Sequence, residues 1–360
     1  MSFDSMQWFD TYFFLWLALS FFFNGLVAYL WYKKFYLKLG LKQYQAIQRI
    51  HLNETPRLGG LIFIMCLMGY AWTSNYSEST DLLKVILLSL MPAMIVALKE
   101  DLLQNVEPAI RLLSLLLAGW IFKSSYVGHL PNLNDISIVS SLLSIQGGAS
   151  LFYIFGMVAI ANGMNLIDGV NGLCGAVALS ILSALLFLAY KTSDVMMLPI
   201  IFGVMLLTIS FLIINYPYGR IFLGDLGAYS LGLIVSMLTI ILFGRHPDLN
   251  VWAAALVLIY PLTEVTFSML RRMVKGVSIY HPDRNHLHLK LFYFFRPQLA
   301  YKSIANALVA PLLSGLWLFP LIAISWTYHK FIFIFIAIIL FVAIYILLHN
   351  IIPNVQKTKK

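Results

Sequence analysis

The sequence predicts an all-α polytopic membrane protein with about eleven transmembrane helices. Of its 360 residues, 61% are hydrophobic and only 11% are charged, which is far from the usage of soluble proteins. The apolar runs are long and lack the alternation of membrane strands, so helices are the expected spanning form. The net charge of +9 comes mostly from short segments between these runs, which favours orientation at a membrane over nucleic-acid binding.

The expected spans are apolar runs of about 17 to 24 residues, long enough to cross the hydrocarbon layer of a bilayer. They lie at residues 9–31, 58–74, 82–98, 109–125, 138–161, 173–190, 195–214, 226–244, 250–268, 304–327 and 331–350. No long linker separates them, so residues 1–360 are expected to form a single membrane domain. The first run has no basic segment before it, which favours a retained span over a cleaved signal peptide.

The orientation follows from the cations. Most of the 24 Lys and Arg residues fall in alternate segments, above all 33–57, 269–303 and 357–360. The positive-inside rule therefore predicts an N-terminus outside and a C-terminus in the cytoplasm. Five polar segments then face the cytoplasm together, and this convergence predicts an active-site cleft there. These segments are residues 51–60, 99–111, 162–173, 215–225 and 281–288.

The segment 162–173 reads NGMNLIDGVNGL and lies between two apolar runs. It contains three amides, one carboxylate and three glycines. Taken alone, it is typical of a polar turn between two helices. Polar groups in so apolar a chain are costly unless they bind something, so we also consider a binding site. Glu264 stands inside another apolar run, and we expect it near the cytoplasmic end of its span rather than buried against a partner.

The polar segments carry oxygen donors that suit Mg²⁺, or Mn²⁺, better than zinc. These donors are Glu100, Asp101, Asp168, Asp225, Asn165 and Asn215. The same segments carry cations that can meet phosphate oxygens and histidines that can hold or protonate a phosphate. They are Arg57, Arg220, Arg284, His286 and His288. Each piece also has a plainer interpretation. The acid pair can be a solvated helix end, and the two histidines lack a third zinc ligand.

The chain resembles the polyprenyl-phosphate N-acetylhexosamine-1-phosphate transferases through NGMNLIDGVNGL and FLGDLGAYSLG, with TPRLGG and DRNHLH in support. That membrane family includes the phospho-N-acetylmuramoyl-pentapeptide transferase and the dolichol-phosphate GlcNAc-1-phosphate transferase. The resemblance runs from about residue 50 to residue 291 and implies a bundle of ten or eleven helices with a cytoplasmic cleft. The implied activity is Mg²⁺-dependent transfer of a HexNAc-1-phosphate from a UDP-sugar to undecaprenyl or another polyprenyl phosphate, with release of UMP.

The resemblance also assigns roles. Asp225 and Asn165 match the metal position. The residues that match the uridine region are Asn171, Gly172, Leu173, Asn215 and Phe222. Arg284, His286 and His288 match a cytoplasmic motif near the diphosphate, and Arg57 is expected to bind substrate. Glu100, Asp101 and Asp168 are the expected catalytic acids, although relatives usually carry Asp-Asp where this chain has Glu100-Asp101.

The expected partners are a UDP-N-acetylhexosamine, polyprenyl phosphate and membrane lipid, without nucleic acid, in the bacterial inner membrane. Whether the protein forms a homodimer stays open. The sugar and the pathway also stay open, and the candidate pathways include the synthesis of O-antigen, capsule and cell-wall polymers. Direct in-line attack by the lipid phosphate is preferred over a covalent aspartyl-phosphate intermediate. Two rival functions remain. A secondary transporter also needs many spans with broken helices, and an inactive relative would bind lipid as a scaffold.

Overall fold

The computed structural model describes residues 19, 25, 30, 55–73, 78–132, 147–277, 283–299 and 301–354. Apart from the three single positions, the first expected span lies outside these residues. The described part is helical and contains no strand. Its helices are α2 (Gly59–Thr73), α3 (Glu78–Leu103), α4 (Pro108–Ser125), α6 (Gly148–Ile167), α7 (Leu173–Lys191), α8 (Met197–Asn215), α9 (Gly224–Arg245), α10 (Val251–Val257), α11 (Ile259–Val274), α12 (Leu287–Phe295), α13 (Lys302–Leu312), α14 (Ser314–Trp317), α15 (Phe319–Thr327) and α16 (Phe331–Ile351).

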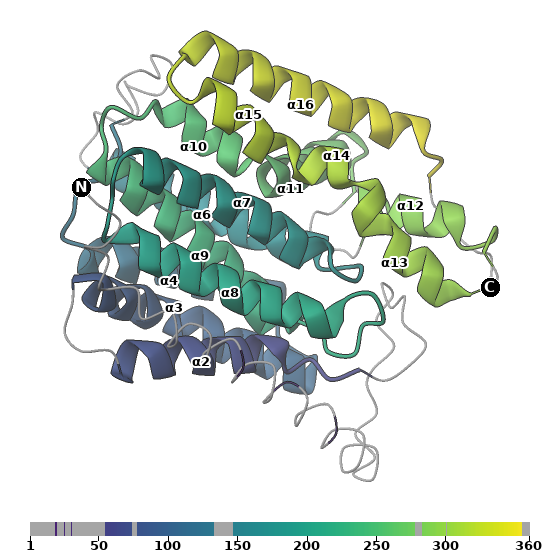
Figure 1. Ribbon diagram of the computed structural model, residues 1–360. Coiled ribbons are helices and arrows are strands. Elements are labelled where there is room, and N and C mark those ends of the chain that lie inside the picture. Colours follow the sequence, from purple (N-terminus) through teal and green to yellow (C-terminus); the bar gives the residue numbers. More distant parts are fainter. Residues whose placement is uncertain are drawn as a thin grey trace.

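The long helices lie side by side in one bundle, with α2 and α3 on one side and α15 and α16 on the other (Figure 1). Helix α9 is the central member, because nearly all of its residues are buried and it packs against α2, α3, α6 and α7. Helix α16 is the opposite case, with large apolar side chains exposed along its length. An exposed apolar helix at the edge of an apolar bundle is the expected pattern for a surface that meets lipid tails.

The helices are consistent with a polytopic membrane protein. Within the described ranges, seven helical segments are long and apolar enough to cross a membrane, or eight if the bent pair α10–α11 counts as one span. Helix α2, at 15 residues, is apolar but shorter. The all-helical class predicted from the sequence is therefore confirmed. The total of eleven spans and the orientation of the chain stay predictions.

Two expected boundaries were wrong. The span expected to end at residue 161 continues as α6 to Ile167, so Asn162 and Asn165 belong to a helix rather than a loop. The side chain of Asn162 fits there because it donates to the carbonyl of Val158 one turn earlier. The span expected at 250–268 breaks into α10 and α11, which meet at an angle of 74°. Pro261 explains the break, since it lacks an N–H and its ring clashes with the carbonyl four residues before it.

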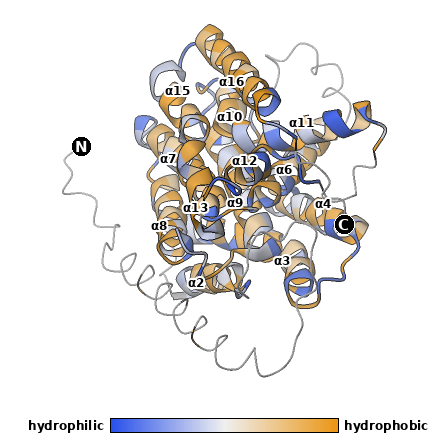
Figure 2. Cartoon of the chain, turned by 90° about the vertical axis from the view of Figure 1, so that its right-hand side faces the viewer, coloured by the Kyte–Doolittle hydropathy of each residue, from blue (hydrophilic) through white to orange (hydrophobic). Residues whose placement is uncertain are grey.

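The chain reverses direction from one long helix to the next, so the ends of different helices meet at the two ends of the bundle. At one end lie the end of α3, α6 and α8 and the beginning of α4, α7 and α9. Figure 2 views the bundle from an end, where hydrophilic segments gather near α9, α12 and α13 among mostly hydrophobic helices. The described parts of the five polar segments all belong to this end, as predicted from the sequence.

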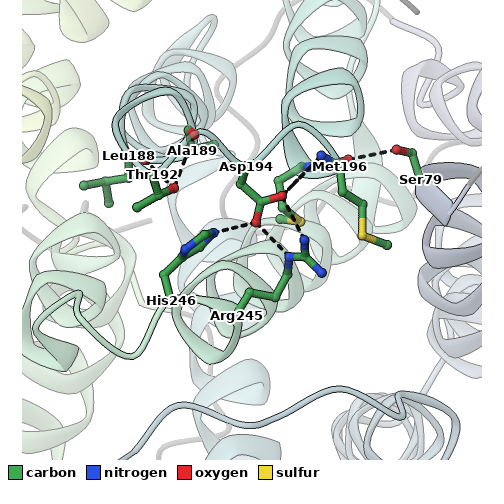
Figure 3. Close-up of polar contacts among 9 residues, drawn as sticks. Ser79, Leu188, Ala189, Thr192, Asp194, Met196, Arg245 and His246 are labelled. Carbon is green, nitrogen blue, oxygen red and sulfur yellow. Dashed lines mark hydrogen bonds and ion pairs between the residues drawn. The ribbon is translucent and has the colours of Figure 1, made fainter. Parts of the chain in front are cut away.

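The opposite end is fastened by a buried carboxylate. Asp194, in the turn between α7 and α8, accepts hydrogen bonds from Nε of Arg245 at 2.7 Å and Nη2 at 3.1 Å. Nε2 of His246 lies 2.7 Å from the same carboxylate (Figure 3). The hydroxyl of Ser79 donates to the carbonyl of Met196 at 3.0 Å. The turn is thereby joined to the end of α9 and to the beginning of α3.

Candidate active site

Asp101 caps the beginning of α9. Its two carboxylate oxygens accept the backbone N–H groups of Asp225 at 2.8 Å and Leu226 at 2.9 Å. These N–H groups have no partner inside the helix, so a carboxylate at this place satisfies them and the helix dipole together. Gly224 has a φ of +75°, and a Cβ on it would lie 2.6 Å from the Asp101 carboxylate. Only glycine fits there, and Asp101 thereby fixes the position of Asp225.

The carboxylate of Asp225 contacts an amide with one oxygen and a guanidinium with the other. Nδ2 of Asn165, from the last turn of α6, donates to one Asp225 oxygen at 3.3 Å. Nη1 of Arg111 lies 3.3 Å from the other oxygen and 3.6 Å from Glu100. A second guanidinium, that of Arg57, lies 3.8 Å from Asp101. The sequence therefore predicted correctly that these acids, Asn165 and Arg57 gather at one place. The sequence did not single out Arg111, the last residue of the polar segment 99–111.

Asp168 follows α6 directly and lies within electrostatic reach of the same cluster. Burial raises the pKa of Asp168 well above its usual range. The positive charge of Arg57 opposes that rise, whereas the negative charges of Asp225 and Asp101 add to it. Burial therefore favours the protonated form of Asp168. A carboxyl group with this property is suited to proton transfer near neutral pH.

The turn that follows is held by two distant amide side chains. The N–H of Asn171 donates to Oδ1 of Asn306 in α13 at 2.7 Å. The N–H of Gly172 donates to Oδ1 of Asn215, the last residue of α8, at 2.7 Å. Gly172 has a φ of +80°, which suits glycine. Leu173 begins α7 and is fully buried. The structure therefore brings the predicted uridine-region residues together and adds Asn306, which no motif had indicated.

The same turn contacts the segment between α8 and α9. Nδ2 of Asn171 donates to the carbonyl of Pro217 at 2.8 Å. Oδ1 of Asn171 is buried and has no hydrogen-bond partner within the described residues. A Cβ on Gly219 would lie 2.8 Å from that oxygen and 3.1 Å from the ring of Phe222. A buried acceptor without a donor is costly, so this oxygen is a candidate contact for a ligand N–H group.

The segment before α2 pairs with the segment before α9 through their backbones. The N–H of Phe222 donates to the carbonyl of Pro56 at 2.9 Å. In return, Gly59 donates to the carbonyl of Phe222 at 3.0 Å, and Gly60 to that of Leu223 at 2.9 Å. Two motifs that are far apart in the sequence, TPRLGG and FLGD, therefore form one small unit. Its role is to place Arg57 and Asp225 beside Asp101.

The two predicted histidines occupy different environments. His288 is completely buried, and neither ring nitrogen has a hydrogen-bond partner among the residues that the structure describes. Its Nε2 lies so close to Gly169 that a Cβ there would be 2.6 Å away. Burial lowers the pKa of His288 to about 4, so its ring is neutral near pH 7. Arg284 is half-buried in the same segment.

His286 is paired with an acid that we had placed elsewhere. Its Nδ1 lies 2.9 Å from Oε1 of Glu264, and both side chains are buried. The preferred expectation for Glu264, a simple position near the end of its span, was therefore wrong, and burial against partners is what occurs. The reason is that the break before α11 turns this face of the helix toward the segment that carries His286. The rings of His286 and His288 stack with centroids 5.8 Å apart.

The donors fit a magnesium ion in their chemistry. Across the described ranges, no three His, Cys, Asp or Glu side chains are grouped so as to hold a metal ion by themselves. Magnesium does not need such a group, because it takes one or two carboxylates and completes its shell with water and substrate phosphate. The Asp225 carboxylate and the Asn165 amide are donors of this kind. The guanidinium of Arg111 already lies against Asp225, as a cation would.

Comparisons with known proteins cover this part of the chain. The model of the glycosyl transferase family 4 matches residues 82–243, which include the acid pair, the turn after α6 and the beginning of α9. Over this region the chain is similar to glycosyl transferase family 4. This match supports the resemblance seen in the sequence. The family-matched region ends before Glu264, His286 and Asn306, so the contacts of these three residues come from the structure alone.

Individual relatives cover most of the chain. A protein of Bacillus subtilis, "Probable undecaprenyl-phosphate N-acetylglucosaminyl 1-phosphate transferase", is 26% identical over 73% of this chain and 72% of its own length. A "Phospho-N-acetylmuramoyl-pentapeptide-transferase" of Streptococcus pneumoniae is 24% identical over 70% of this chain and 77% of its own. A protein of the same name from Latilactobacillus sakei is 25% identical over 66% and 77%. All three relatives are transferases by name.

Proposed function

We propose that this protein transfers a HexNAc-1-phosphate from a UDP-sugar to a polyprenyl phosphate and releases UMP. The observation that carries the proposal is the cluster at the beginning of α9, where Asp101 positions Asp225 beside Asn165 and two guanidiniums. The names of the relatives support it, since one of them is described as acting on undecaprenyl phosphate. The product would be a polyprenyl-diphosphate sugar, the first lipid-linked stage of a cell-surface glycan.

The reaction brings two phosphorylated reactants together, so negative charge must be balanced. Arg57 and Arg111 are cations placed to meet phosphate oxygens. Asp225 and Asn165 would hold Mg²⁺, or Mn²⁺. When bound, the ion supplies charge neutralisation on the diphosphate and on the leaving UMP. For this to happen Arg111 must leave Asp225, and a diphosphate is the natural new partner of its guanidinium.

The nucleoside end of the donor would lie at the turn formed by Asn171, Gly172 and Leu173. The unpartnered Oδ1 of Asn171 accepts a hydrogen bond in this arrangement, and the nearby ring of Phe222 supplies a flat apolar surface. Asn215 contributes indirectly, because its amide group fixes Gly172 and also donates to the carbonyl of Ile221. The turn and the carboxylate cluster adjoin each other along the chain, as a nucleotide-sugar requires.

The acceptor phosphate needs orientation more than a strong base, because its second pKa is about 6. Asp168, with its raised pKa, is the group that we assign to receive the proton. Both oxygens of Asp101 are used by backbone N–H groups, so Asp101 acts by positioning Asp225. Glu100 holds the N–H of Val106 with one oxygen and faces Arg111 with the other. Direct attack by the lipid phosphate remains the preferred route, on the cytoplasmic side of an inner membrane.

The test is a turnover assay in membranes that contain the chain, with radiolabelled UDP-HexNAc donors and polyprenyl phosphate. Asp225→Asn is expected to lower turnover by about 100-fold or more, because it removes the charge that holds the metal. Asp248→Asn is the matched control, since Asp248 is exposed in the turn before α10. Chelation should abolish turnover, and added Mg²⁺ should restore it.

Three results would count against parts of this proposal. Wild-type turnover in Asp225→Asn would remove the metal assignment. UMP released without lipid acceptor, or ping-pong kinetics, would favour the covalent route. A wild-type chain that releases no UMP with any donor of a HexNAc panel would remove the transferase and leave the transporter or the scaffold.

A further inference from the structure

The carboxylate of Glu264 is the most deeply buried charge among the described residues that no step above uses. Its residue has no exposed surface. A buried carboxylate in an apolar helix bundle is costly unless it is paired, and membrane proteins keep such groups mostly for function. Glu264 has two partners, one on each oxygen. Oε1 lies 2.9 Å from Nδ1 of His286, and Oε2 accepts the hydroxyl of Tyr345 at 2.8 Å.

These three residues come from three separate parts of the chain. Glu264 belongs to α11, His286 to the segment before α12, and Tyr345 to α16. Because Glu264 takes Nδ1, the nitrogen that His286 has left for a substrate is Nε2. A carboxylate on one imidazole nitrogen fixes the orientation of the ring and favours its protonated form. The carboxylate therefore affects both the orientation and the charge of the imidazole, which an apolar contact in the same place would not do.

The Glu264–His286 pair is connected to the candidate active site through the ring of His288. His286 stacks on His288, and Nε2 of His288 lies against Gly169, the residue after Asp168. The segment itself is anchored on the other side. Nε2 of His349 lies 2.9 Å from the carbonyl of Asn285, and the amino group of Lys290 donates to the carbonyl of His349. The ring of His286 is therefore held between a fixed carboxylate and the turn that carries Asp168.

We propose that Glu264 is a positioning residue for the transfer reaction, one that orients the ring of His286 and keeps it protonated so that Nε2–H faces the phosphates of the substrates. The inference rests on the proposed function for its chemical meaning.

The titratable and charged groups around His286 are Glu264, Tyr260 and Arg271 from α11, Tyr345 and His349 from α16, His288 and Lys290 from α12, and Asp283 and Arg284 from its own segment. Arg271 is paired with Asp283, which leaves Glu264 as the carboxylate in contact with His286.

The first experiment compares Glu264→Gln with the wild-type chain. Glutamine keeps the size and an acceptor for Nδ1–H but removes the charge. We expect kcat to fall about 10- to 100-fold, with the KM for the UDP-sugar changed less than twofold. The alkaline limb of the kcat profile should move to lower pH, by about one unit, because the imidazolium loses its neighbouring anion. Glu264→Asp keeps the charge and should restore part of kcat and of the profile.

A double variant separates this role from simple packing. If Glu264 acts through His286, then Glu264→Gln combined with His286→Gln should be no slower than His286→Gln alone. Tyr345→Phe is the milder companion, because it removes one hydrogen bond and leaves the charge, so kcat should fall only a few-fold. Independent, multiplying losses in the double variant, or an unmoved pH profile in Glu264→Gln, would overturn the inference.

A measurement without turnover keeps the inference apart from the proposed function. In chain labelled with ¹⁵N-histidine, the signal of His286 is assigned by its loss in His286→Gln. We expect a protonated ring at pH 7 in the wild-type chain and a neutral ring in Glu264→Gln. A neutral ring in both would overturn the inference even in an active enzyme. A charged ring that becomes neutral in the variant would sustain the pairing even if no donor sugar is turned over.

Discussion

At the scale of single residues, side-chain amides shape the candidate nucleotide site. The backbone N–H groups of Asn171 and Gly172 already have acceptors, from Asn306 and Asn215 respectively. A ligand at this turn therefore meets side-chain groups and carbonyls rather than these two donors. The turn keeps its form because two amide oxygens from opposite directions hold consecutive peptide groups. Asn306 is as much a part of that frame as the residues inside the motif.

Replacing Asn306 by Leu should weaken donor binding. The change leaves the N–H of Asn171 buried without an acceptor, which costs about 1–3 kcal/mol. If the turn shifts to relieve that cost, the KM for the UDP-sugar should rise about tenfold, the equivalent of about 1.4 kcal/mol. The KM for polyprenyl phosphate should stay the same. Steady-state kinetics with each substrate varied in turn measures both.

Ser303→Ala is the control for Asn306→Leu, because Ser303 is exposed on the same helix. Inhibition by UMP should weaken in parallel with the donor KM, since UMP shares the nucleoside. Equal changes in both substrate constants would show a general disturbance and would contradict a role of Asn306 at the nucleotide turn.

At the scale of elements, the contact between α2 and α9 sets where the carboxylate cluster stands. Gly60 and Gly227 meet with no room for a side chain, since a Cβ on Gly60 would lie 2.2 Å from the backbone nitrogen of Gly227. Small residues let two helix backbones approach closely, which is a common way to pack helices in membranes. The first turn of α9, with Asp225, is thereby pressed against the segment that carries Arg57.

Gly60→Ala should therefore harm both stability and activity. Backbone atoms cannot move aside as a side chain does, so the helices must separate, at a cost of about 1–3 kcal/mol in the free energy of unfolding. Gly69→Ala on the same helix is the matched control, because a Cβ there meets nothing within 4 Å. Unfolding in detergent and the turnover assay would measure the two effects. Equal behaviour of the two variants would contradict the tight contact.

At the scale of the whole molecule, the bundle is joined at both ends by ionised groups, although its middle is apolar. The cluster around Asp225 joins α3, α4, α6 and α9 at one end. Asp194 joins the α7–α8 turn to the end of α9 at the other (Figure 3). Since α9 runs between the two, the far end contributes to holding the active-site end in register.

Asp194→Asn should lower the free energy of unfolding by about 3 kcal/mol near neutral pH, because hydrogen bonds to a charged group are worth more than neutral ones. Burial raises the pKa of Asp194, but the hydrogen bonds from Arg245 and His246 outweigh it and hold that pKa below its usual range. A carboxyl with a lowered pKa stabilises the fold above its ordinary pKa of 3.8 and loses this effect as the pH falls below that value.

The stability difference between wild type and Asp194→Asn should therefore be constant from about pH 7 to pH 5 and shrink toward pH 3. Thermal unfolding in detergent across this range measures it. Asp248→Asn, exposed in a nearby turn, serves as the reference. A difference that stays the same down to pH 3 would contradict the charged role of Asp194.

Much of this arrangement followed from the sequence because it depends on local pattern. The apolar runs predicted the helices, and the alternation of their directions brought Glu100, Asp101, Asn165 and Asp225 to one end. What the sequence could not predict depends on partners far along the chain. Asn306 meets Asn171 across 135 positions, and Tyr345 meets Glu264 across 81. Single residues of this kind lie in no motif, and only the packing of the helices decides which of them touch.

The end of α6 was predicted wrongly for a related reason. Asparagine and glycine disfavour helix interiors, so the run of polar residues from Asn162 predicted a turn. In the structure, the close approach of α11, where a Cβ on Gly163 would lie 2.3 Å from the carbonyl of Pro261, requires glycine inside the helix. Packing therefore outweighed the local preference, and it left Asn165 projecting from a rigid helix toward Asp225.

The backbone pairing of residues 56–60 with residues 222–223 bears on how a substrate could enter the candidate site. Three backbone hydrogen bonds and the contact between Gly60 and Gly227 join the start of α2 to the start of α9, beside Asp225. If the proposed donor binds here, we expect the site to widen on the opposite side, where α12 and α13 contact the turn through His288 and Asn306. The carboxy-terminal third of the chain would then supply this movement, while the motifs TPRLGG and FLGD stay joined to each other.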